Sequence, residues 1–368
     1  MHLCCSAIAK CPRKEDDLAN RRGNRPGDRR RMHAKDNFPM TTSVTGTGIA
    51  GIAISGNGFS AEIAYEGATL LSWQPHLAEG GKCENLVDGY LTPAELQSQG
   101  GVRNGILAPF TNRIPDGRFS FGGETHQIEP VLASESLVFH GFARALPFAL
   151  TRSFEEDGVH VLVFRTEISP GDFKGYPYHL AIEVEYQFSG HDVTIDIRGI
   201  NGDDRPLPFA AGWHPYFRLP GMASINDLHL RLPSRTAIET DEHLIPLLDR
   251  KNGFLKRRDD ATFLAAAPLA GHVLDVCFTD LIASENGLYE TRLENRRNGS
   301  SLTIWQERGH MHVFTGDTLA RDRRTSIALE PVETPTNAFN QPELAAAITL
   351  QPGETRNFRF GFRFETAR

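Results

Sequence analysis

The chain of 368 residues lacks long apolar runs, and its charge is not strongly of one sign. No segment approaches the roughly 18 uninterrupted apolar residues of a membrane-spanning helix, so we expect no membrane partner. With a formal net charge of −7 and no motif of an RNA- or DNA-binding domain, the main body of the chain is not expected to bind nucleic acid. These features favour a globular protein that acts on a small polar molecule.

Cysteine is also scarce, and its positions form no pattern. The five residues are Cys4, Cys5, Cys11, Cys83 and Cys277, an odd number clustered near the N-terminus, so no disulfide framework is predicted. The segment HLCCSAIA has no positive leader and is short of the roughly 7–15 apolar residues in the core of a secretory signal. We therefore predict a cytoplasmic protein.

The first part of the chain differs from the rest in composition. It is rich in Arg, Asp, Asn and Gly and has almost no apolar periodicity, so burial cannot offset the entropy of ordering it. We predict that residues 1–43 are a disordered tail, or that they precede a true start at Met32 or Met40, and that residues 44–368 form one domain. A basic arm that binds nucleic acid is the less favoured reading of residues 1–43.

From about residue 44 onward, apolar and polar residues alternate with the period of β-strands. Residues 180–188 and 193–197 alternate on either side of the turn SGHD, which predicts a hairpin, and residues 358–364 predict a further strand with four phenylalanines on one face. Additional hairpins are predicted at 118–129, 147–168 and 289–306. The tripeptide NGS at 298–300 matches a glycosylation acceptor, but its position between two alternating runs favours a turn.

Only two short helices are predicted. In TPAELQSQ, Thr92 is placed to cap the helix, Pro93 to occupy its first position and Glu95 to complete a capping box. The segment QPELAAAI at 341–348 is the second candidate. Since no sequence repeat is visible, a propeller or solenoid is not expected. The predicted fold is all-β: a large antiparallel β-sandwich with a few short helices and a concave face able to hold a ligand.

Four polar clusters interrupt the strands, and each holds a side chain able to transfer a proton or bind a hydroxyl group. They are FTNRIPDGRF (110–119), FHGFAR (139–144), AGWHPYFRL (211–219) and ALEPVETPTNAFNQP (328–342). In the third cluster His214 precedes Pro215, which restricts the histidine to extended backbone geometry. We interpret the four clusters as one site assembled from distant segments.

In their order and spacing, these clusters resemble the aldose 1-epimerase, or galactose mutarotase, family. The segment LDVCFTDL (274–281) is similar to the Asp-containing segment of that family, and the resemblance covers residues 44–365. It implies a supersandwich of antiparallel strands with a sugar across the concave face, and neither a metal nor an organic cofactor. The implied partner is a sugar, and we expect a monomer or a homodimer.

The resemblance also implies roles for individual residues. It makes Glu330 the general base and His214 the general acid. The implied substrate-binding residues are Arg113, His140, Asp275, Asn112, Arg144 and Tyr216. Glu333 is the main rival to Glu330, and Asp280 lies close to Asp275. His310 and His312, two apart on a strand, could ligate a metal, but structural or pocket-rim histidines are favoured.

The chemistry implied for Glu330 and His214 is self-consistent. Mutarotation removes a proton from the anomeric hydroxyl and adds one to the ring oxygen, so that the ring opens and closes again on the other face. A glutamate of pKa about 4.3 is ionised near neutral pH, and a histidine of pKa about 6.5 needs a modest upward shift to donate. Each such group can contribute about 10²–10⁴-fold to the rate.

Three alternative functions remain open at this point. A hexose-6-phosphate 1-epimerase would need cations at the exocyclic end of the sugar, for which Arg118 and Arg144 are candidates. A non-catalytic sugar-binding protein could keep the same fold. A glycoside hydrolase also places an acid and a base across a sugar ring, but commonly uses two carboxylates.

Overall fold

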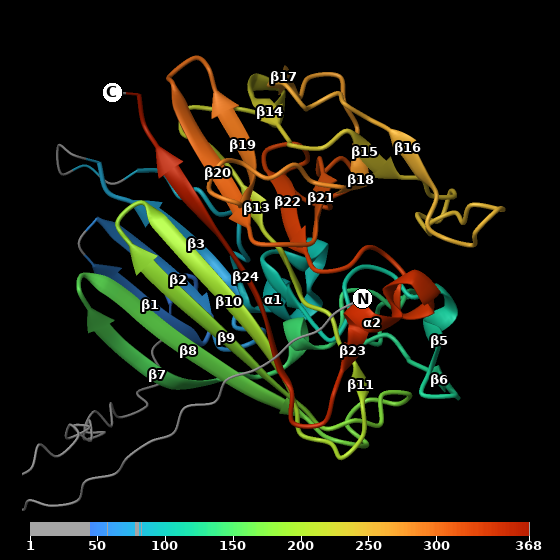
Figure 1. Ribbon diagram of the computed structural model, residues 1–368. Coiled ribbons are helices and arrows are strands. Elements are labelled where there is room, and N and C mark those ends of the chain that lie inside the picture. The colour runs from blue at the N-terminus through green and yellow to red at the C-terminus, as the bar shows by residue number, and fades with distance from the viewer. Residues whose placement is uncertain (1–44, 57, 78–80, 82, 368) are drawn as a thin grey trace, which may run out of the picture. The chain divides into compact units, whose positions relative to one another are not determined.

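A computed structural model describes residues 45–56, 58–77, 81 and 83–367 of the chain (Figure 1). The predicted tail over residues 1–43 lies outside the described residues. The described part consists mostly of antiparallel strands with a few short helices, so the predicted fold class is confirmed. No helix in this part of the chain is long and apolar enough to span a membrane.

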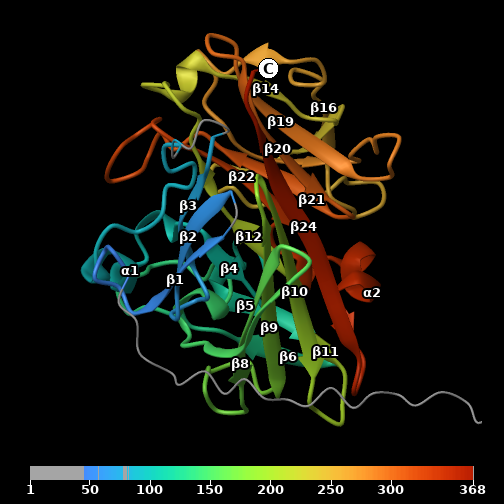
Figure 2. The same ribbon diagram turned by 90° about the vertical axis from the view of Figure 1, so that its left-hand side faces the viewer.

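The larger of the two main sheets, here called the back sheet, has nine strands. Its order across the sheet is β17 (Ala267–Pro268), β14 (His229–Arg231), β19 (Tyr289–Asn295), β20 (Ser300–Gln306), β24 (Thr355–Glu365), β10 (Asp192–Asn201), β9 (Leu180–Ser189), β8 (Val159–Ile168) and β7 (Ala149–Glu156). The predicted hairpins at 180–197, 147–168 and 289–306 are all found here, and Figure 2 shows β24 running between β10 and β20.

The second main sheet, here called the front sheet, has eight strands. Its order is β16 (Arg257–Asp259), β15 (Thr236–Ile238), β18 (Asp275–Thr279), β21 (His310–Phe314), β22 (Ile327–Val332), β12 (Gly212–His214) and β4 (Gly105–Leu107), with β13 (Tyr216–Phe217) paired to β22. All of these pairs are antiparallel. Four segments that are remote in sequence therefore become neighbours in β18, β21, β22 and β12.

The remaining elements are smaller. A third sheet joins β1 (Gly51–Gly56), β2 (Phe59–Ala64) and β3 (Leu70–Pro75), and the two-stranded sheets are β5 (Arg118–Phe121) with β6 (Glu124–Gln127) and β11 (Leu207–Pro208) with β23 (Thr349–Leu350). The pair β5–β6 is the hairpin predicted at 118–129. The predicted helix at 341–348 is a 3₁₀ turn, Pro342–Leu344, followed by α2 (Ala345–Ile348).

The helix α1 (Pro93–Ser98) begins as predicted, with one difference. Thr92 caps it, because its side chain accepts a hydrogen bond from the backbone N–H of Glu95 at 3.1 Å. The Glu95 carboxylate accepts from the backbone N–H of Leu91 at 2.8 Å and not from that of Thr92. Only half of the predicted capping box is therefore present, and the other half is displaced by one residue.

The main core lies between the two main sheets and is rich in aromatic rings. The phenylalanines on one face of β24, predicted from its alternation, are all buried. Trp213 of β12 stacks on Phe360 and Phe362 with ring centroids 5.7 and 5.6 Å apart, and Trp73 of β3 meets Phe362 edge-on at 5.0 Å. The front sheet and the three-stranded sheet are thus packed on the same face of the back sheet.

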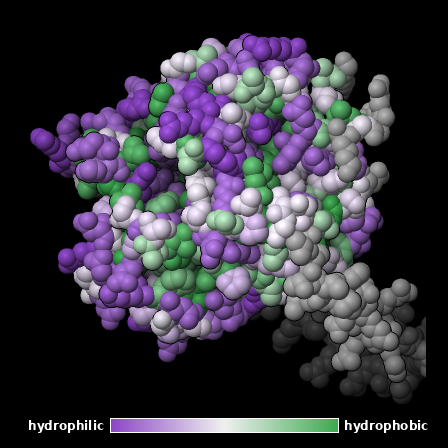
Figure 3. All heavy atoms as spheres, turned by 180° about the vertical axis from the view of Figure 1, so that it is seen from behind, coloured by the Kyte–Doolittle hydropathy of each residue, from purple (hydrophilic) through white to green (hydrophobic). Residues whose placement is uncertain are grey.

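The outer surface carries polar and apolar residues in a mixed pattern. The face shown in Figure 3 has hydrophilic and hydrophobic side chains interspersed, with a recess between hydrophilic groups at one side. Scattered apolar residues on a surface are usual and indicate no particular function. The front sheet has a second face, which is turned away from the core and carries His214, His312 and Glu330.

Candidate active site

Alternation along the front sheet brings four side chains together on its outer face. Along β12, β22 and β21, the residues Trp213, Leu329 and Met311 point into the core, and because neighbours along a strand point to opposite faces, the residues next to them point outward. His312 lies directly opposite Glu330 on one side and opposite Cys277 on the other. His214 lies on the other side of Glu330, since the pair Gly212 and Val332 sets the register of β12 against β22. A row across the sheet is thus formed by Cys277, His312, Glu330 and His214.

The row ends at a residue without a side chain. His214 is paired with Gly105 of β4, and Val102 and Arg144 fill the space that a side chain at this glycine would take. Asp275 precedes Cys277 by two residues on β18, so its side chain points to the same face. It is therefore a diagonal neighbour of His312. Strand register alone therefore explains why Glu330, His214, His312 and Asp275 converge.

Two loops carry the remaining polar groups over this face. The segments at 112–113 and 139–140 are joined by an isolated bridge between Arg113 and Phe139, and the N–H of His140 donates to the carbonyl of Asn112 at 2.9 Å. His140 has a φ of 60° and Gly141 a φ of 66°. A Cβ on Gly141 would lie 2.1 Å from the carbonyl oxygen of Ala108, so only glycine permits this close approach.

The segment that holds His214 is hydrogen-bonded to a buried asparagine, Asn104. The backbone N–H of Asn104 donates to the carbonyl of His214, and its own carbonyl accepts from the Trp213 indole at 3.0 Å. The Asn104 side chain accepts from the N–H of Tyr216 at 2.9 Å and donates to the carbonyl of Leu70 at 2.8 Å. These bonds, together with Pro215, fix the backbone that carries the imidazole.

The outer face and the two loops enclose a cleft of 370 Å³. Seven of the eight residues predicted as catalytic or substrate-binding line it: Asn112, Arg113, His140, His214, Tyr216, Asp275 and Glu330. The sequence interpretation of four clusters as one site thus agrees with the structure, which brings these residues together. Of the three aromatic residues close to His214 in the chain, Trp213 and Phe217 pack in the core, and Tyr216 reaches the cleft.

Arg144 does not line this cleft, in contrast to the sequence prediction. Its side chain is fully buried, and its guanidinium donates to both carboxylate oxygens of Glu135 at 2.7 and 2.8 Å. The guanidinium carbon also lies 5.0 Å from the centre of the Phe139 ring. Since HGFAR turns sharply at Gly141, Arg144 lies behind the loop, while His140 lines the cleft.

Glu333 and Asp280, the two rival carboxylates, lie elsewhere. Glu333 follows β22 and accepts from the N–H of Ala211 at 3.0 Å and from Arg308 at 2.7 Å, and it is not among the cleft residues. Asp280 is exposed beyond the end of β18. Glu330, by contrast, lies inside β22 and is 2% exposed. Of each pair of rival carboxylates, Glu330 and Asp275 are thus the ones that line the cleft.

Two short contacts organise the polar groups of the cleft. His214 Nε2 lies 3.4 Å from Glu330 Oε1, and His312 Nε2 lies 2.7 Å from Asp275 Oδ1. Arg113 reaches the other oxygen of Asp275 at 3.9 Å and donates to the side chain of Asn112 at 3.3 Å. The rings of His140 and His214 are nearly perpendicular, with centroids 5.0 Å apart.

Burial shifts the pKa values of Glu330 and His214 in opposite directions. The pKa of Glu330 rises to about 8, because burial disfavours its charge and Asp275 adds repulsion, while His312 and Arg113 oppose the rise. Burial lowers the pKa of His214 to about 3, and the charge of His312 adds to this effect. The upward shift of the pKa expected for His214 from the sequence is therefore wrong, because the imidazole is buried.

The same two groups can nevertheless share one proton. With these pKa values the proton is favoured on Glu330, with His214 neutral, and moving it to His214 gives a carboxylate beside an imidazolium. The two arrangements carry the same net charge. Hydrogen bonds from a bound hydroxyl group to the carboxylate would stabilise the charged arrangement. The site is thus suited to move a proton in each direction across a bound molecule.

His312 is the titratable residue of the cleft to which the sequence assigns no role in the reaction. The sequence favours a structural or pocket-rim histidine over a metal ligand, because the contact with Asp275 depends on the pairing of β18 with β21. His310, its neighbour on the strand, does not line the cleft. Within the described ranges, no three potential ligands are grouped closely enough to hold a metal ion.

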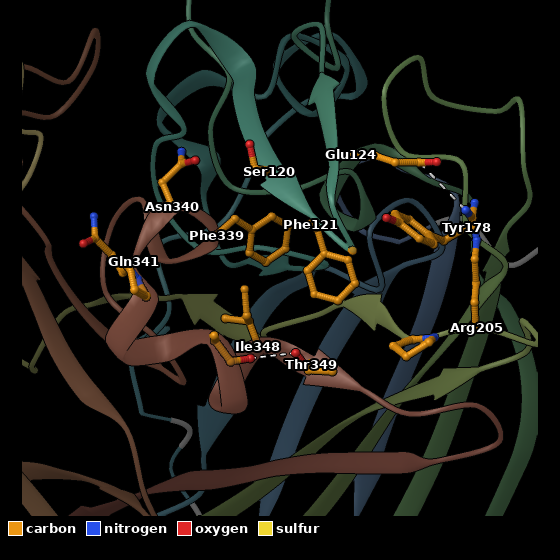
Figure 4. Close-up of a pocket in the computed structure, with 14 residues that line it drawn as sticks. Ser120, Phe121, Glu124, Tyr178, Arg205, Phe339, Asn340, Gln341, Ile348 and Thr349 are labelled. Carbon is orange, nitrogen blue, oxygen red and sulfur yellow. Dashed lines mark hydrogen bonds and ion pairs between the residues drawn. The ribbon is translucent and has the colours of Figure 1, made fainter.

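A second, larger cleft of 780 Å³ lies beside β5, β6 and α2. Figure 4 shows Phe121 and Phe339 in its middle and Tyr178 and Arg205 at one side. Its charged groups, Arg205 and Glu124, are paired at 4.0 Å, and Arg205 covers the Tyr178 ring at 4.8 Å. Because the described residues of its lining include no histidine and no unpaired carboxylate, this cleft has no evident means of proton transfer.

Comparisons with known proteins agree with the geometry. The family model described as aldose 1-epimerase matches residues 52–363. The galactose mutarotase of Mus musculus is 24% identical over 84% of this chain and 92% of its own length, and the uncharacterized protein YihR of Escherichia coli K12 is 25% identical over 64% and 71%. The crystal structure of the GalM/aldose epimerase homologue from C. elegans has a TM-score of 0.72 at 19% identity, covering 86% of this chain and 99% of that one, which supports the fold.

Proposed function

The chain belongs to the aldose 1-epimerase family and is an isomerase, and from this premise we propose that it interconverts the α and β anomers of an unphosphorylated hexose or a related aldose. The observation that carries the proposal is the approach of His214 to Glu330, at 3.4 Å, within a cleft whose other polar groups suit sugar hydroxyls. A cytoplasmic location stays a prediction from the cysteine pattern.

In the proposed reaction, Glu330 acts at the anomeric hydroxyl and His214 at the ring oxygen. Glu330 takes the proton of the O1 hydroxyl while protonated His214 gives its proton to O5, and the bond between C1 and O5 breaks. After rotation about the C1–C2 bond, the O5 hydroxyl attacks the other face of the aldehyde. Glu330 then returns its proton to O1, and His214 regains its proton from O5, so both groups end as they began.

The proton arrangement that these pKa values favour corresponds to the open-chain stage of this cycle. At that stage Glu330 carries the proton and His214 is neutral, in agreement with their pKa values of about 8 and about 3. The charged arrangement needed to open the ring must then be stabilised by the bound sugar and by Arg113 and His312.

The remaining cleft residues would orient the sugar. Arg113 and Asn112 offer N–H donors from one loop, and Asp275 offers an acceptor from β18. Burial and the neighbouring cations hold the pKa of His140 well below its usual value, so it would bind hydroxyl groups as a neutral ring. Fixed donors and acceptors of this kind reduce the entropy cost of reaching the reactive geometry.

A neutral sugar fits better than a sugar phosphate. Of the two cations considered for a phosphate, Arg144 is bound to Glu135 behind the loop, and Arg118 is exposed on β5 and does not line the cleft. Among the described residues, Arg113 is the one arginine in the lining, and it already faces Asp275. We therefore expect glucose 6-phosphate to be a poorer substrate than glucose.

The test is anomer exchange measured by saturation-transfer NMR on glucose, galactose, arabinose and glucose 6-phosphate. We expect accelerated exchange for at least one neutral aldose and its loss in the variants Glu330→Gln and His214→Asn. Binding without exchange would instead identify a non-catalytic sugar-binding protein. Release of the aglycone from an aryl glycoside would identify a hydrolase.

A further inference from the structure

His312 occupies the centre of the catalytic row, yet no proton-transfer step of the proposed reaction uses it. It is 6% exposed, and its Nε2 atom is hydrogen-bonded to Asp275 Oδ1 at 2.7 Å. Across β21 and β22 it is the direct partner of Glu330. Directly paired residues on one face have Cβ atoms about 4.5–5.5 Å apart. His312 therefore lies between the two carboxylates of the cleft.

Every element packed against His312 contributes a polar group that bears on its charge. The groups are Asp275 and Cys277 from β18, Glu330 from β22, His214 from β12, and Arg113 and His140 from the two loops. Burial alone would favour a neutral ring. Against it, Glu330 and the hydrogen bond to Asp275 raise the pKa of His312 well above its usual value. The two carboxylates outweigh burial.

The two carboxylates need such a cation if both are to be ionised at once. Glu330 and Asp275 lie on the same face of the front sheet, and each raises the energy of the other's charge. Arg113 is the other cation, but it is 3.9 Å from Asp275, reaches it from the loop and is 24% exposed, so solvent screens part of its charge. His312 is more deeply buried, and it contacts Asp275 directly.

We propose that His312 is a positioning residue of the reaction: as an imidazolium held by Asp275, it provides the positive charge that allows Glu330 to act as a carboxylate base. This role rests on the proposed mutarotase function and adds a residue to it. His312 does not itself exchange a proton with the sugar. It also fixes the orientation of Asp275, whose second oxygen is left for Arg113 and the substrate.

The deciding variant is His312→Gln, because glutamine can still donate a hydrogen bond to Asp275 but carries no charge. We expect the alkaline limb of kcat/KM against pH, where the pair of Glu330 and His214 loses the proton that it shares, to move up by about 1–3 units, since an adjacent opposite charge shifts a carboxyl pKa by that much. At pH 7, kcat should fall by about tenfold or more, while KM changes less, because a smaller share of the pair is in the charged arrangement. A higher pH should not restore the rate, since it removes the shared proton.

The matched control is His310→Gln, on the same strand and outside the cleft lining. It should leave the alkaline limb where it is in the unaltered protein. An alkaline limb that stays in place in His312→Gln, with a folded protein of normal KM, would overturn the proposal. If the unaltered protein exchanges no aldose at all, the proposed function fails instead, so the two failures are distinguishable.

A second measurement needs no variant. Nitrogen-15 NMR of the histidine rings in the unaltered protein should show one buried imidazole that stays protonated from pH 6 to pH 8. The signal can be assigned to His312 by its disappearance in the glutamine variant. If that variant does not fold, a protein in which no buried imidazole is protonated over this range would overturn the proposal.

Discussion

The two faces of the front sheet are built from the same strands and differ in almost every physical respect. On the inner face, Trp213, Met311 and Leu329 pack against the aromatic side of β24, and their neighbours His214, His312 and Glu330 form the outer face. The inner face is stabilised by the burial of apolar surface. The outer face buries titratable groups at an energetic cost. Alternation thus places the most stabilising and the most reactive residues one position apart.

The largest expected effect is on the outer face. Glu330→Gln keeps the shape of the side chain but removes the base, and we expect the exchange rate to fall by about 10²–10⁴-fold. The free energy of unfolding should not fall, because burial disfavours the charged form of the carboxyl group that is removed. Exchange NMR and thermal unfolding of the same sample check both statements. A variant with normal activity would remove Glu330 from the mechanism.

The opposite result is expected on the inner face. Phe362→Ala, which removes the ring shared by Trp73 and Trp213, should lower the free energy of unfolding by about 3–5 kcal/mol. Phe154→Ala on β7 is the matched control, since Phe154 is 41% exposed and its loss should cost less than about 0.5 kcal/mol. Urea unfolding measures both. Equal losses would contradict the placement of the core.

The stability of the protein should depend on pH through Glu330 on the outer face, whereas the apolar residues of the inner face do not titrate. The pKa of Glu330 is raised from 4.5 to about 8 on folding, so the folded state holds a proton that the unfolded state releases. Its contribution to stability is present below pH 4.5 and is lost as the pH rises towards 8.

Urea unfolding at pH 5 and pH 8 can isolate this contribution. The unaltered protein should lose more stability between the two pH values than Glu330→Gln does, because glutamine does not titrate. Groups that do not interact with Glu330 titrate alike in both proteins and cancel in the difference; His312, whose pKa Glu330 raises, is the exception. Equal losses in the two proteins would mean that Glu330 is already ionised in the folded protein at pH 5.

The smallest effect is expected for Glu333→Gln. The same substitution, of glutamine for glutamate, is made here three residues beyond Glu330. Glu333 binds Ala211 and Arg308 outside the cleft. Exchange activity should stay close to that of the unaltered protein, with a modest loss of stability from the weakened contact with Arg308. A loss of activity as large as that in Glu330→Gln would make Glu333 the base.

Much of this organisation was predictable from the sequence. Alternation identified the strands around 180–197 and 358–364 and hence the buried face of β24, because it depends only on residues close in the chain. The four polar clusters identified most of the cleft through their resemblance to a family. Of the two acidic residues in EPVE, Glu330 is also the one that lies in the cleft.

The remainder depended on contacts between remote segments. The role of His312 follows from the register of β21 between β18 and β22, which no local pattern specifies. Arg144 lies near His140 in sequence, but the turn at Gly141 directs it to Glu135. The downward pKa shift of His214 arises from burial by several elements at once. These are properties of the assembled sheet and loops.

The most direct test of the central claim is a crystal structure of the Glu330→Gln variant with a bound aldose. We predict one pyranose in the cleft of 370 Å³, with the amide introduced at position 330 within hydrogen-bond distance of the anomeric hydroxyl and His214 Nε2 within that distance of the ring oxygen. A sugar that contacts only one of these two groups, or that binds instead in the cleft beside Phe121 and Tyr178, would contradict the account.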